Sequence, residues 1–347
     1  MGHDLHFLHI GAETGGNREL MQARWGDRFY FMPYTKPHAG TGLTKRLRRF
    51  FKRMTLSIDD WYDPSLDKVL VSLSKVIQFD VVIVEYVVFS KALECFRKNV
   101  LKLVDTIDVF SNRHERMIGQ GLQPGWYSAS PQEEARGLNR ADVVIAISEE
   151  DQRFLSGLTH QKVITLGHIV PLYEPIRQPS RTGKMLFVGS SNPMNVQAIR
   201  FFANEVLPRV KMQYPPAQLL IAGTICELLE DRDDWAKLGK IEDLRPVYTA
   251  VDLVINPMIF GTGLSIKSLE ALGHAKPLVT TSNGARGLIE GEGDAYLVAD
   301  TPDEFSSAVV SVLSDARRSE ELSRKAYEMV VRWNRRNVCT LESLLNA

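Results

Sequence analysis

The sequence predicts an α/β protein with two Rossmann-like, parallel-sheet domains. Buried apolar strands alternate with helical patterns in both halves of the chain, and this alternation is typical of parallel sheets. A proline-rich stretch, residues 170–183, separates the halves. We therefore expect a first domain over residues 1–170, a linker over 171–183, a second domain over 184–330 and a helix end over 331–347 that returns toward the first domain.

Composition excludes several classes of protein. Lys plus Arg and Asp plus Glu number 42 each, so the net charge does not favour a nucleic-acid partner. The three cysteines, Cys95, Cys226 and Cys339, are far apart, which argues against a disulfide framework or a zinc site and fits a reducing cytoplasm. We find no apolar run long enough to span a bilayer and no signal-peptide pattern. We expect a cytoplasmic protein that is not integral to a membrane.

In the first half, acidic residues follow the predicted strands. Strands are expected over residues 3–10, 28–32, 80–86, 100–108, 142–148 and 162–166, with helices over 67–77 and 90–98. Ligands bind beyond the carboxyl ends of parallel strands, so Glu85, Asp105 and Asp108 are candidates for a binding cleft. Ser148 is expected only to cap the helix that follows it.

Residues 43–54, LTKRLRRFFKRM, predict a basic amphipathic helix. Its apolar side chains share one helical face and six basic side chains occupy the rest, a segregation that favours binding to an anionic membrane surface. Two alternatives stay open: the apolar face packs on its own domain, or the basic face binds nucleic acid. The residues expected at the membrane surface are Lys45, Arg46, Arg48, Arg49, Phe50, Phe51, Lys52 and Arg53.

The second half is organised around residues 251–277, where a strand over 251–256 precedes a glycine loop and a helix. The helix is expected to begin near Leu264 and to end at Gly273, with Leu264, Leu269 and Leu272 on its buried side. A glycine loop before a helix N-terminus presents free backbone N–H groups and the positive end of the helix dipole, which suit a phosphate.

Lys267 and Glu270 share a face of this helix. Lys267 would add a positive charge beside the phosphate, and Glu270 is placed to accept hydrogen bonds from sugar hydroxyls. These groups together predict a site for a nucleoside diphosphate. The alternative is an exposed i,i+3 salt bridge on an ordinary helix.

The remaining strands of the second half also end in small turns. Strands over 184–188 and 218–222 are followed by Gly189 and Gly223, and a turn follows at residues 239–241. Further expected elements are a helix over 195–207, a strand over 277–281 and helices over 302–313 and 320–345.

The runs LFVGSSNPMNVQAIRFFANEVLP, LLIAG and LGKIEDLRPVYTAVDLVINPMIFGTGLSIKSLEALGHAKPLVTT resemble the carboxyl half of glycosyltransferases of family 4 (glycosyl transferases group 1) and close relatives. The first half is similar more loosely, through GHDLHFLHIG, LVDTIDVFSNR and ADVVIAIS. The resemblance implies the GT-B fold, with two domains facing a cleft, and metal-independent sugar transfer from a nucleotide sugar on the second domain to an acceptor on the first.

Carried over to this chain, the resemblance implies that Gly263, Leu264 and Lys267 hold the diphosphate, that Glu270 holds the ribose, and that the backbone of residues 239–241 holds the base. The predicted donor-binding set is Gly189, Ser190, Asn192, Gly223, Gly239, Lys240, Ile241, Thr262, Gly263, Leu264, Ser265, Lys267 and Glu270. Lys267 is also a catalytic candidate because it would stabilise charge on the departing diphosphate.

Asp108 is the second catalytic candidate, a general base for the acceptor hydroxyl if the reaction inverts configuration. The alternative is that Asp105 or Asp108 caps the next helix and pairs with Arg113 or Arg116.

Two features depart from the family pattern. Thr262 stands where many family 4 members carry a glutamate, and GHDLHFLHI resembles the second strand of such folds, so the usual first strand and its glycine loop are not found. The acidic run at residues 231–233 has a DxD pattern, but its charged neighbours favour a solvated surface over a metal site.

The expected function is a glycosyltransferase of cell-surface polysaccharide or glycolipid synthesis, peripheral on the inner face of the cytoplasmic membrane. It would use a UDP- or GDP-linked donor without a cofactor, and a glycan or lipid-linked acceptor. A nucleotide-sugar epimerase or hydrolase of the same fold, or a non-catalytic GT-B binding module, stays open.

Overall fold

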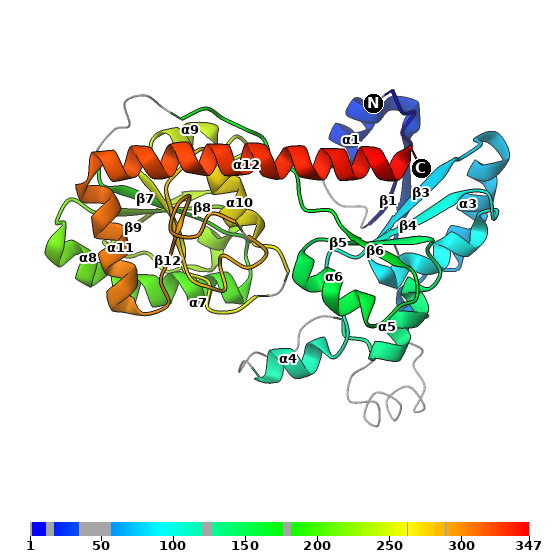
Figure 1. Cartoon of the computed structure of the whole chain (residues 1–347), viewed down its shortest axis with the longest axis horizontal. Helices are drawn as coiled ribbons and strands as arrows, with labels where there is room; N and C mark the ends of the chain where they lie inside the picture. Colours follow the sequence, from blue (N-terminus) through cyan, green and yellow to red (C-terminus); the bar gives the residue numbers. More distant parts are fainter. Residues whose placement is uncertain are drawn as a thin grey trace. The chain divides into compact units, whose positions relative to one another are not determined.

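The computed structural model describes residues 2–11, 17–34, 57–119, 127–175, 182–261, 263–288 and 290–346. It divides into two compact units (Figure 1), which are described separately. Unit 1 comprises Met1–Thr165 and Leu345–Ala347, and unit 2 comprises Leu166–Leu344. The predicted membrane-surface segment, residues 43–54, and Thr262 lie outside the described residues.

The described residues of unit 1 form two parallel sheets. One has four strands in the order β3 (Val81–Glu85), β4 (Leu101–Asp105), β5 (Val143–Ala146) and β6 (Lys162–Thr165), and the other pairs β1 (Phe7–Gly11) with β2 (Phe29–Pro33). The α-helices are α1 (Asn17–Trp25), α3 (Ser65–Val76), α4 (Arg113–Gly119), α5 (Pro131–Leu138) and α6 (Glu149–Ser156). The 3₁₀ segments are η1 (Gly26–Arg28), η2 (Ile58–Trp61) and η3 (Val87–Cys95).

Local sequence explains most of these elements. Ser148 caps α6 by accepting a hydrogen bond from the Asp151 amide at 3.1 Å, which confirms its predicted role. The helix expected over 90–98 is wrong, because this stretch forms the 3₁₀ segment η3. Tyr86 precedes it at φ 65°, a left-handed conformation that redirects the chain, and the valines and phenylalanine that follow are poor helix formers.

Unit 2 contains one six-stranded parallel sheet. Its order is β12 (Leu297–Val298), β11 (Leu278–Thr280), β10 (Leu253–Asn256), β7 (Lys184–Val188), β8 (Gln218–Ala222) and β9 (Trp235–Gly239). Counted along the chain this is the 3-2-1-4-5-6 order of a dinucleotide-binding domain, whose ligand crevice opens where the order reverses, between β7 and β10. The parallel-sheet architecture predicted from the sequence is confirmed in both units.

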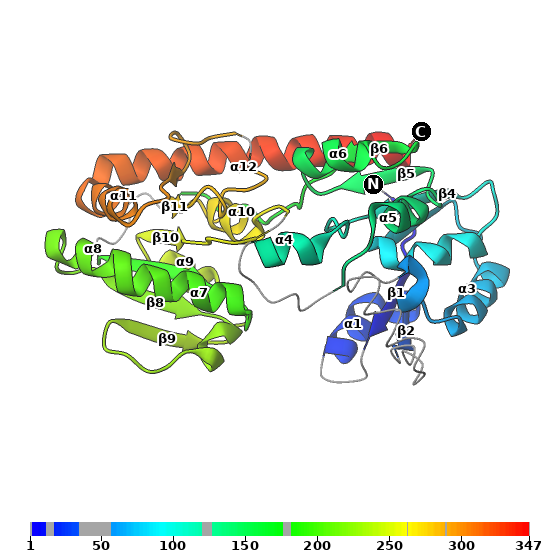
Figure 2. The same cartoon turned by 90° about the horizontal axis from the view of Figure 1, so that it is seen from below.

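Helices lie on both faces of this sheet (Figure 2). They are α7 (Pro193–Phe201), the π-helical turn η4 (Phe202–Val206), α8 (Leu207–Gln213), the 3₁₀ segment η5 (Thr224–Leu228), α9 (Arg245–Thr249), α10 (Ile266–Gly273), α11 (Pro302–Ser314) and α12 (Ala316–Leu345). Leu264, Leu269 and Leu272 are buried as predicted, at 8%, 0% and 0% exposure. Within the described residues, we find no helix long and apolar enough to cross a bilayer.

Candidate functional site

Backbone hydrogen bonds at three glycines join the carboxyl ends of β7, β8 and β9. The Gly223 amide donates to the Gly239 carbonyl at 2.8 Å, and the Ile225 amide donates to the Gly189 carbonyl at 3.2 Å. Gly223 has φ +104°, and a Cβ there would lie 2.1 Å from the Gly189 oxygen. Only glycine fits this close approach, so the sequence places bare backbone at this edge of the crevice.

The first turn of α7 lies at the end of β7. Asn192 caps it by accepting from the Met194 amide at 2.9 Å. Asn195, 4% exposed, donates through Nδ2 to the Ser190 carbonyl at 3.0 Å and to the Ser190 hydroxyl at 3.3 Å. Asn195 therefore fixes the turn that contains the predicted donor-binding residues Gly189, Ser190 and Asn192.

The first turn of α10 follows β10. Gly263 has φ +70°, and Ser265 occupies the N-cap position without a side-chain capping bond. Asn256, buried at the end of β10, donates through Nδ2 to the hydroxyls of Ser265 and Ser268 at 3.0 and 2.8 Å. Asn256 thus fixes the turn, while no described side chain caps the backbone amides of the first turn of α10. A bound anion could accept hydrogen bonds from these amides.

Lys267 links the two helix starts. Its Nζ donates to Asn195 Oδ1 at 2.5 Å, lies 3.4 Å from Met258 Sδ, and lies 5.2 Å from the centroid of the Phe187 ring. Burial lowers the pKa of the ammonium to about 8. Because no carboxylate among the described residues pairs with it, this partly buried charge is available to an anionic ligand.

Glu270 lies one turn further along α10 and is partly buried, and burial raises the pKa of its carboxyl. The described part of the chain supplies no hydrogen bond or ion pair to this carboxylate, so the salt bridge to Lys267 that was left open is not present. Beside it, His274 stacks between Tyr248 and Tyr173, with ring centroids 3.9 and 4.4 Å apart. The stacked His274 is the C-cap residue of α10. The Glu270 carboxylate is able to accept hydrogen bonds from a ligand.

The structure brings some predicted residues together and leaves others apart. Lys240 and Ile241 follow β9, and no contact in the described structure joins either of them to Lys267. The sequence analysis missed Asn195 and Asn256, which link strand ends to helix starts. Asn256 ends a predicted strand and Asn195 begins a predicted helix, but the sequence does not reveal what either asparagine contacts.

In unit 1, Asp108 lies in the loop that follows β4. Its Oδ2 is 2.9 Å from Arg113 Nη1, which is one of the pairings left open. The loop is held by Glu134, a fully buried carboxylate that accepts from the amides of Phe110 and Ser111 at 2.9 and 2.7 Å. Asp108 is therefore fixed on both sides, and Glu134, which the sequence analysis missed, is the residue that fixes its loop.

Two further carboxyl groups lie at the carboxyl ends of β3 and β4. Glu85 and Asp105 are register partners at the ends of β3 and β4. Burial, and then the charge of Glu85, raise the pKa of Asp105 to about 6. Asp105 therefore titrates closer to neutral pH than an ordinary aspartate does, next to the loop of Asp108.

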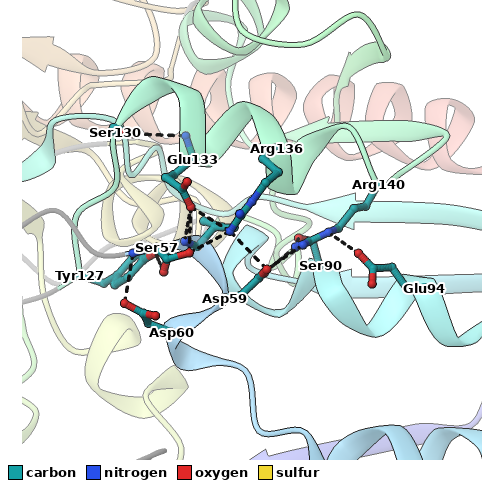
Figure 3. Close-up of polar contacts among 11 residues, drawn as sticks. Ser57, Asp59, Asp60, Ser90, Glu94, Tyr127, Ser130, Glu133, Arg136 and Arg140 are labelled. Carbon is teal, nitrogen blue, oxygen red and sulfur yellow. Dashed lines mark hydrogen bonds and ion pairs between the residues drawn. The ribbon is translucent and has the colours of Figure 1, made fainter. Parts of the chain in front are cut away.

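Arg136 of α5, the helix of Glu134, and Arg140, two residues after the end of α5, contact η2 and the residues next to it (Figure 3). Arg140 pairs with Asp59 at 2.7 Å and with Glu94 at 2.8 Å, and Arg136 donates to the Ser57 hydroxyl at 2.8 Å. Ser57 is the first described residue after the predicted membrane-surface segment. The helix α5 therefore contacts both the loop of Asp108, through Glu134, and Ser57, through Arg136.

Comparison with known proteins finds a family match within the second unit. Residues 182–315 match the family Glycosyl transferases group 1, which confirms the resemblance stated from the sequence. This stretch contains the glycines, Asn195, Lys267 and Glu270.

An uncharacterized 44.6 kDa protein in the cps region of Klebsiella pneumoniae is 26% identical over 181 residues, 46% of this chain and 47% of that protein. The match thus spans about half the length of this relative. The structure of TarM from S. aureus aligns with a TM-score of 0.64 at 13% identity, covering 82% of this chain and 59% of TarM. HepE from Anabaena, solved with UDP and glucose, aligns with a TM-score of 0.62 at 17% identity, covering 97% of this chain and 91% of HepE. These likenesses show that the fold is GT-B, as expected.

Proposed function

We propose that this chain, which contains a Glycosyl transferases group 1 domain, transfers a sugar from a nucleotide sugar to a glycan acceptor. The observation that carries the proposal is the Lys267 ammonium. It is partly buried, has no counter-ion among the described residues, and is held by Asn195 where two helix N-termini meet the switch point of the sheet. A diphosphate supplies the charge that such a site lacks.

In the proposed mechanism, the diphosphate of the donor binds the backbone of Gly263 and Leu264 at the start of α10. When the bond to the sugar breaks, negative charge grows on the departing diphosphate, and the Lys267 ammonium and the α10 amides stabilise it. Glu270 accepts hydrogen bonds from the ribose hydroxyls, and the turn after Gly239 lies against the base. These groups place the needed positive charge without a metal ion.

A UDP-linked donor is our first choice over a GDP-linked one, because HepE and TarM were solved with UDP. We propose a lipid-linked glycan as acceptor, in cell-surface polysaccharide synthesis, since the Klebsiella relative is from a cps region. The basic amphipathic pattern of residues 43–54 supports action at the inner face of the cytoplasmic membrane.

Isothermal titration with UDP and GDP tests the donor site. We expect Lys267→Ala to weaken diphosphate binding and to cost about 2 to 4 kcal/mol of transition-state stabilisation, as removal of a preformed charge-stabilising donor does. Lys211→Ala, on α8, is the matched control and should leave binding unchanged. The proposal fails if the unaltered chain binds neither nucleotide.

Product analysis with a panel of nucleotide sugars and extracted lipid acceptors separates the alternatives. Release of nucleotide only in the presence of acceptor supports transfer. Release without acceptor supports a hydrolase or an epimerase, and no release with any acceptor supports a non-catalytic binding module.

A further inference from the structure

The turn over residues 281–288, which follows β11, packs against the start of α10. The Ser265 amide donates to the Arg286 carbonyl at 2.9 Å. Gly287 has φ +81°, and a Cβ there would lie 3.0 Å from Leu264 Cα, so the two backbones approach closely. The turn is therefore fixed beside the residues that we propose bind the diphosphate of the donor.

The side chain of Arg286 extends along the same residues. Its Nη1 donates to the Gly261 carbonyl at 3.2 Å, and the residue is partly buried. Arg286 thus joins the turn after β11 to the loop after β10. A guanidinium has five N–H donors, and the bond to Gly261 uses one of them.

Two carboxylates of the segment after this turn interact with α12. Glu290 Oε1 lies 3.1 Å from Arg336 Nη1, and Asp294 Oδ2 lies 3.2 Å from Lys325 Nζ. These negative charges are directed to α12, whereas the positive charge of Arg286 is directed to the loop before α10.

The order of the strands gives the direction in which a donor would lie. With the base at the turn after β9 and the diphosphate at the start of α10, the donor crosses the carboxyl ends of the strands from β9 toward β10. The sugar is bonded to the far end of the diphosphate, and the next strand in the sheet is β11. The sugar would therefore lie near the turn of Arg286. Lys267 lies on the other side of the loop, where it donates to Asn195 of α7, the helix that follows β7.

We propose that the donor sugar carries a carboxylate, as a uronic acid does, and that Arg286 binds this carboxylate. The inference rests on the proposed function and names the class of its donor. Lys267 and the α10 amides supply positive charge for the diphosphate, so a second cation on the β11 side is placed for a second negative group. A planar guanidinium matches a carboxylate with two parallel hydrogen bonds, whereas a neutral sugar offers only hydroxyls.

Titration calorimetry of the full chain with UDP, UDP-glucose and UDP-glucuronate tests the proposal. The two sugar nucleotides differ only in the carboxylate that replaces the hydroxymethyl group of the sugar. We expect UDP-glucuronate to bind at least about tenfold more tightly than UDP-glucose, as an added hydrogen bond to a charged group allows. If UDP binds but the two sugar nucleotides bind equally, the inference is wrong and the proposed donor site stands. If none of the three binds, the proposed function itself fails.

The variant Arg286→Gln separates a contact with the sugar from a contact with the phosphates. Glutamine can still donate to the Gly261 carbonyl but carries no charge. We expect the variant to lose the preference for UDP-glucuronate and to keep its affinity for UDP, which also reports that the loop is intact. An equal loss of affinity for all three ligands would assign Arg286 to the diphosphate and overturn the inference. The matched control Arg324→Gln, at an exposed position of α12, removes the same charge and should leave all three affinities unchanged.

Discussion

At the scale of single residues, the ammonium of Lys267 is the group whose chemistry depends most on its surroundings. Burial disfavours its charge, while the Asn195 oxygen, at 2.5 Å, favours it. A bound diphosphate would favour the charged form further. Ligand binding and protonation at Lys267 are therefore coupled: a diphosphate binds more tightly when the amine is protonated.

We expect affinity for UDP to fall as the pH rises through the Lys267 pKa of about 8, because the amine becomes neutral above it. Asn195→Leu removes the accepting oxygen without a large loss of volume, so the midpoint of this fall should move to lower pH. Titration calorimetry between about pH 6.5 and 9.5 measures the midpoint. Asn204→Leu, at an exposed position of the same helical run, is the control and should leave it in place. An affinity independent of pH over this range would contradict the role of Lys267.

Asp108 is proposed as the base that accepts the proton of the acceptor hydroxyl. Asp108→Asn should lower turnover by about 10² to 10⁴, the usual contribution of a general base, while UDP affinity stays unchanged. Transfer assays and calorimetry on the same preparation separate the two quantities. Arg113→Gln breaks the same ion pair from the other side. If both variants lose turnover equally, Asp108 serves only to hold Arg113.

The residues differ in how far sequence predicts them. Lys267 and Glu270 could be found because their spacing after a glycine loop carries the chemistry. Asn195, Asn256 and Glu134 could not, because their roles rest on contacts with other elements. Glu134, for example, accepts from amides more than 20 positions earlier in the chain, and no local pattern records this.

At the scale of elements, the glycine turns after the strands of unit 2 decide how closely the strand ends approach. Gly223 and Gly239 both have positive φ, +104° and +73°, but a Cβ at Gly223 would collide with the Gly189 carbonyl, whereas one at Gly239 would meet open space. Gly223→Ala should therefore destabilise unit 2 by strain and by collision, and Gly239→Ala by strain only, about 1 kcal/mol.

Urea unfolding measures the difference between these two variants. We expect the Gly223→Ala variant to lose at least about 2 kcal/mol more of the free energy of unfolding than the Gly239→Ala variant, since the collision is with backbone and cannot be relieved by a rotamer change. Equal losses would show that the strand ends move apart readily.

The observed elements agree best with the predicted ones where the apolar runs of the sequence are long. The strands β7, β8 and β10 lie within the predicted ranges, because continuous buried runs bounded by glycine have few alternatives. Residues 17–25 form α1, for which the sequence analysis predicts no helix. The helix is weakly amphipathic, with Leu20 70% exposed, so its apolar residues do not form the pattern that predicts a helix.

At the scale of the whole molecule, sequence predicts parallel sheets but not their order. Strand, helix and strand alternation requires parallel pairing. The 3-2-1-4-5-6 order of unit 2 brings β7 beside β10, although about 65 residues separate them, and this pairing places Asn195 within reach of Lys267. The separation of β1 and β2 from the sheet of β3–β6 likewise emerges only in three dimensions.

The last prediction concerns where the molecule works. The sequence of residues 43–54 predicts a helix with six basic side chains opposite an apolar face, so we expect the chain to bind vesicles that contain anionic lipid and to release them at high salt. Each basic residue near such a surface contributes about 1 kcal/mol, so the Arg48→Glu, Arg49→Glu double variant should bind ten- to a hundredfold more weakly. The control is Arg317→Glu, Arg318→Glu, an exposed adjacent pair at the start of α12, which carries the same change of charge and should bind as the unaltered chain does. Co-sedimentation with vesicles of graded anionic content measures all three. If binding ignores both lipid charge and the first double variant, this segment packs on its own domain, and a soluble acceptor becomes the better hypothesis.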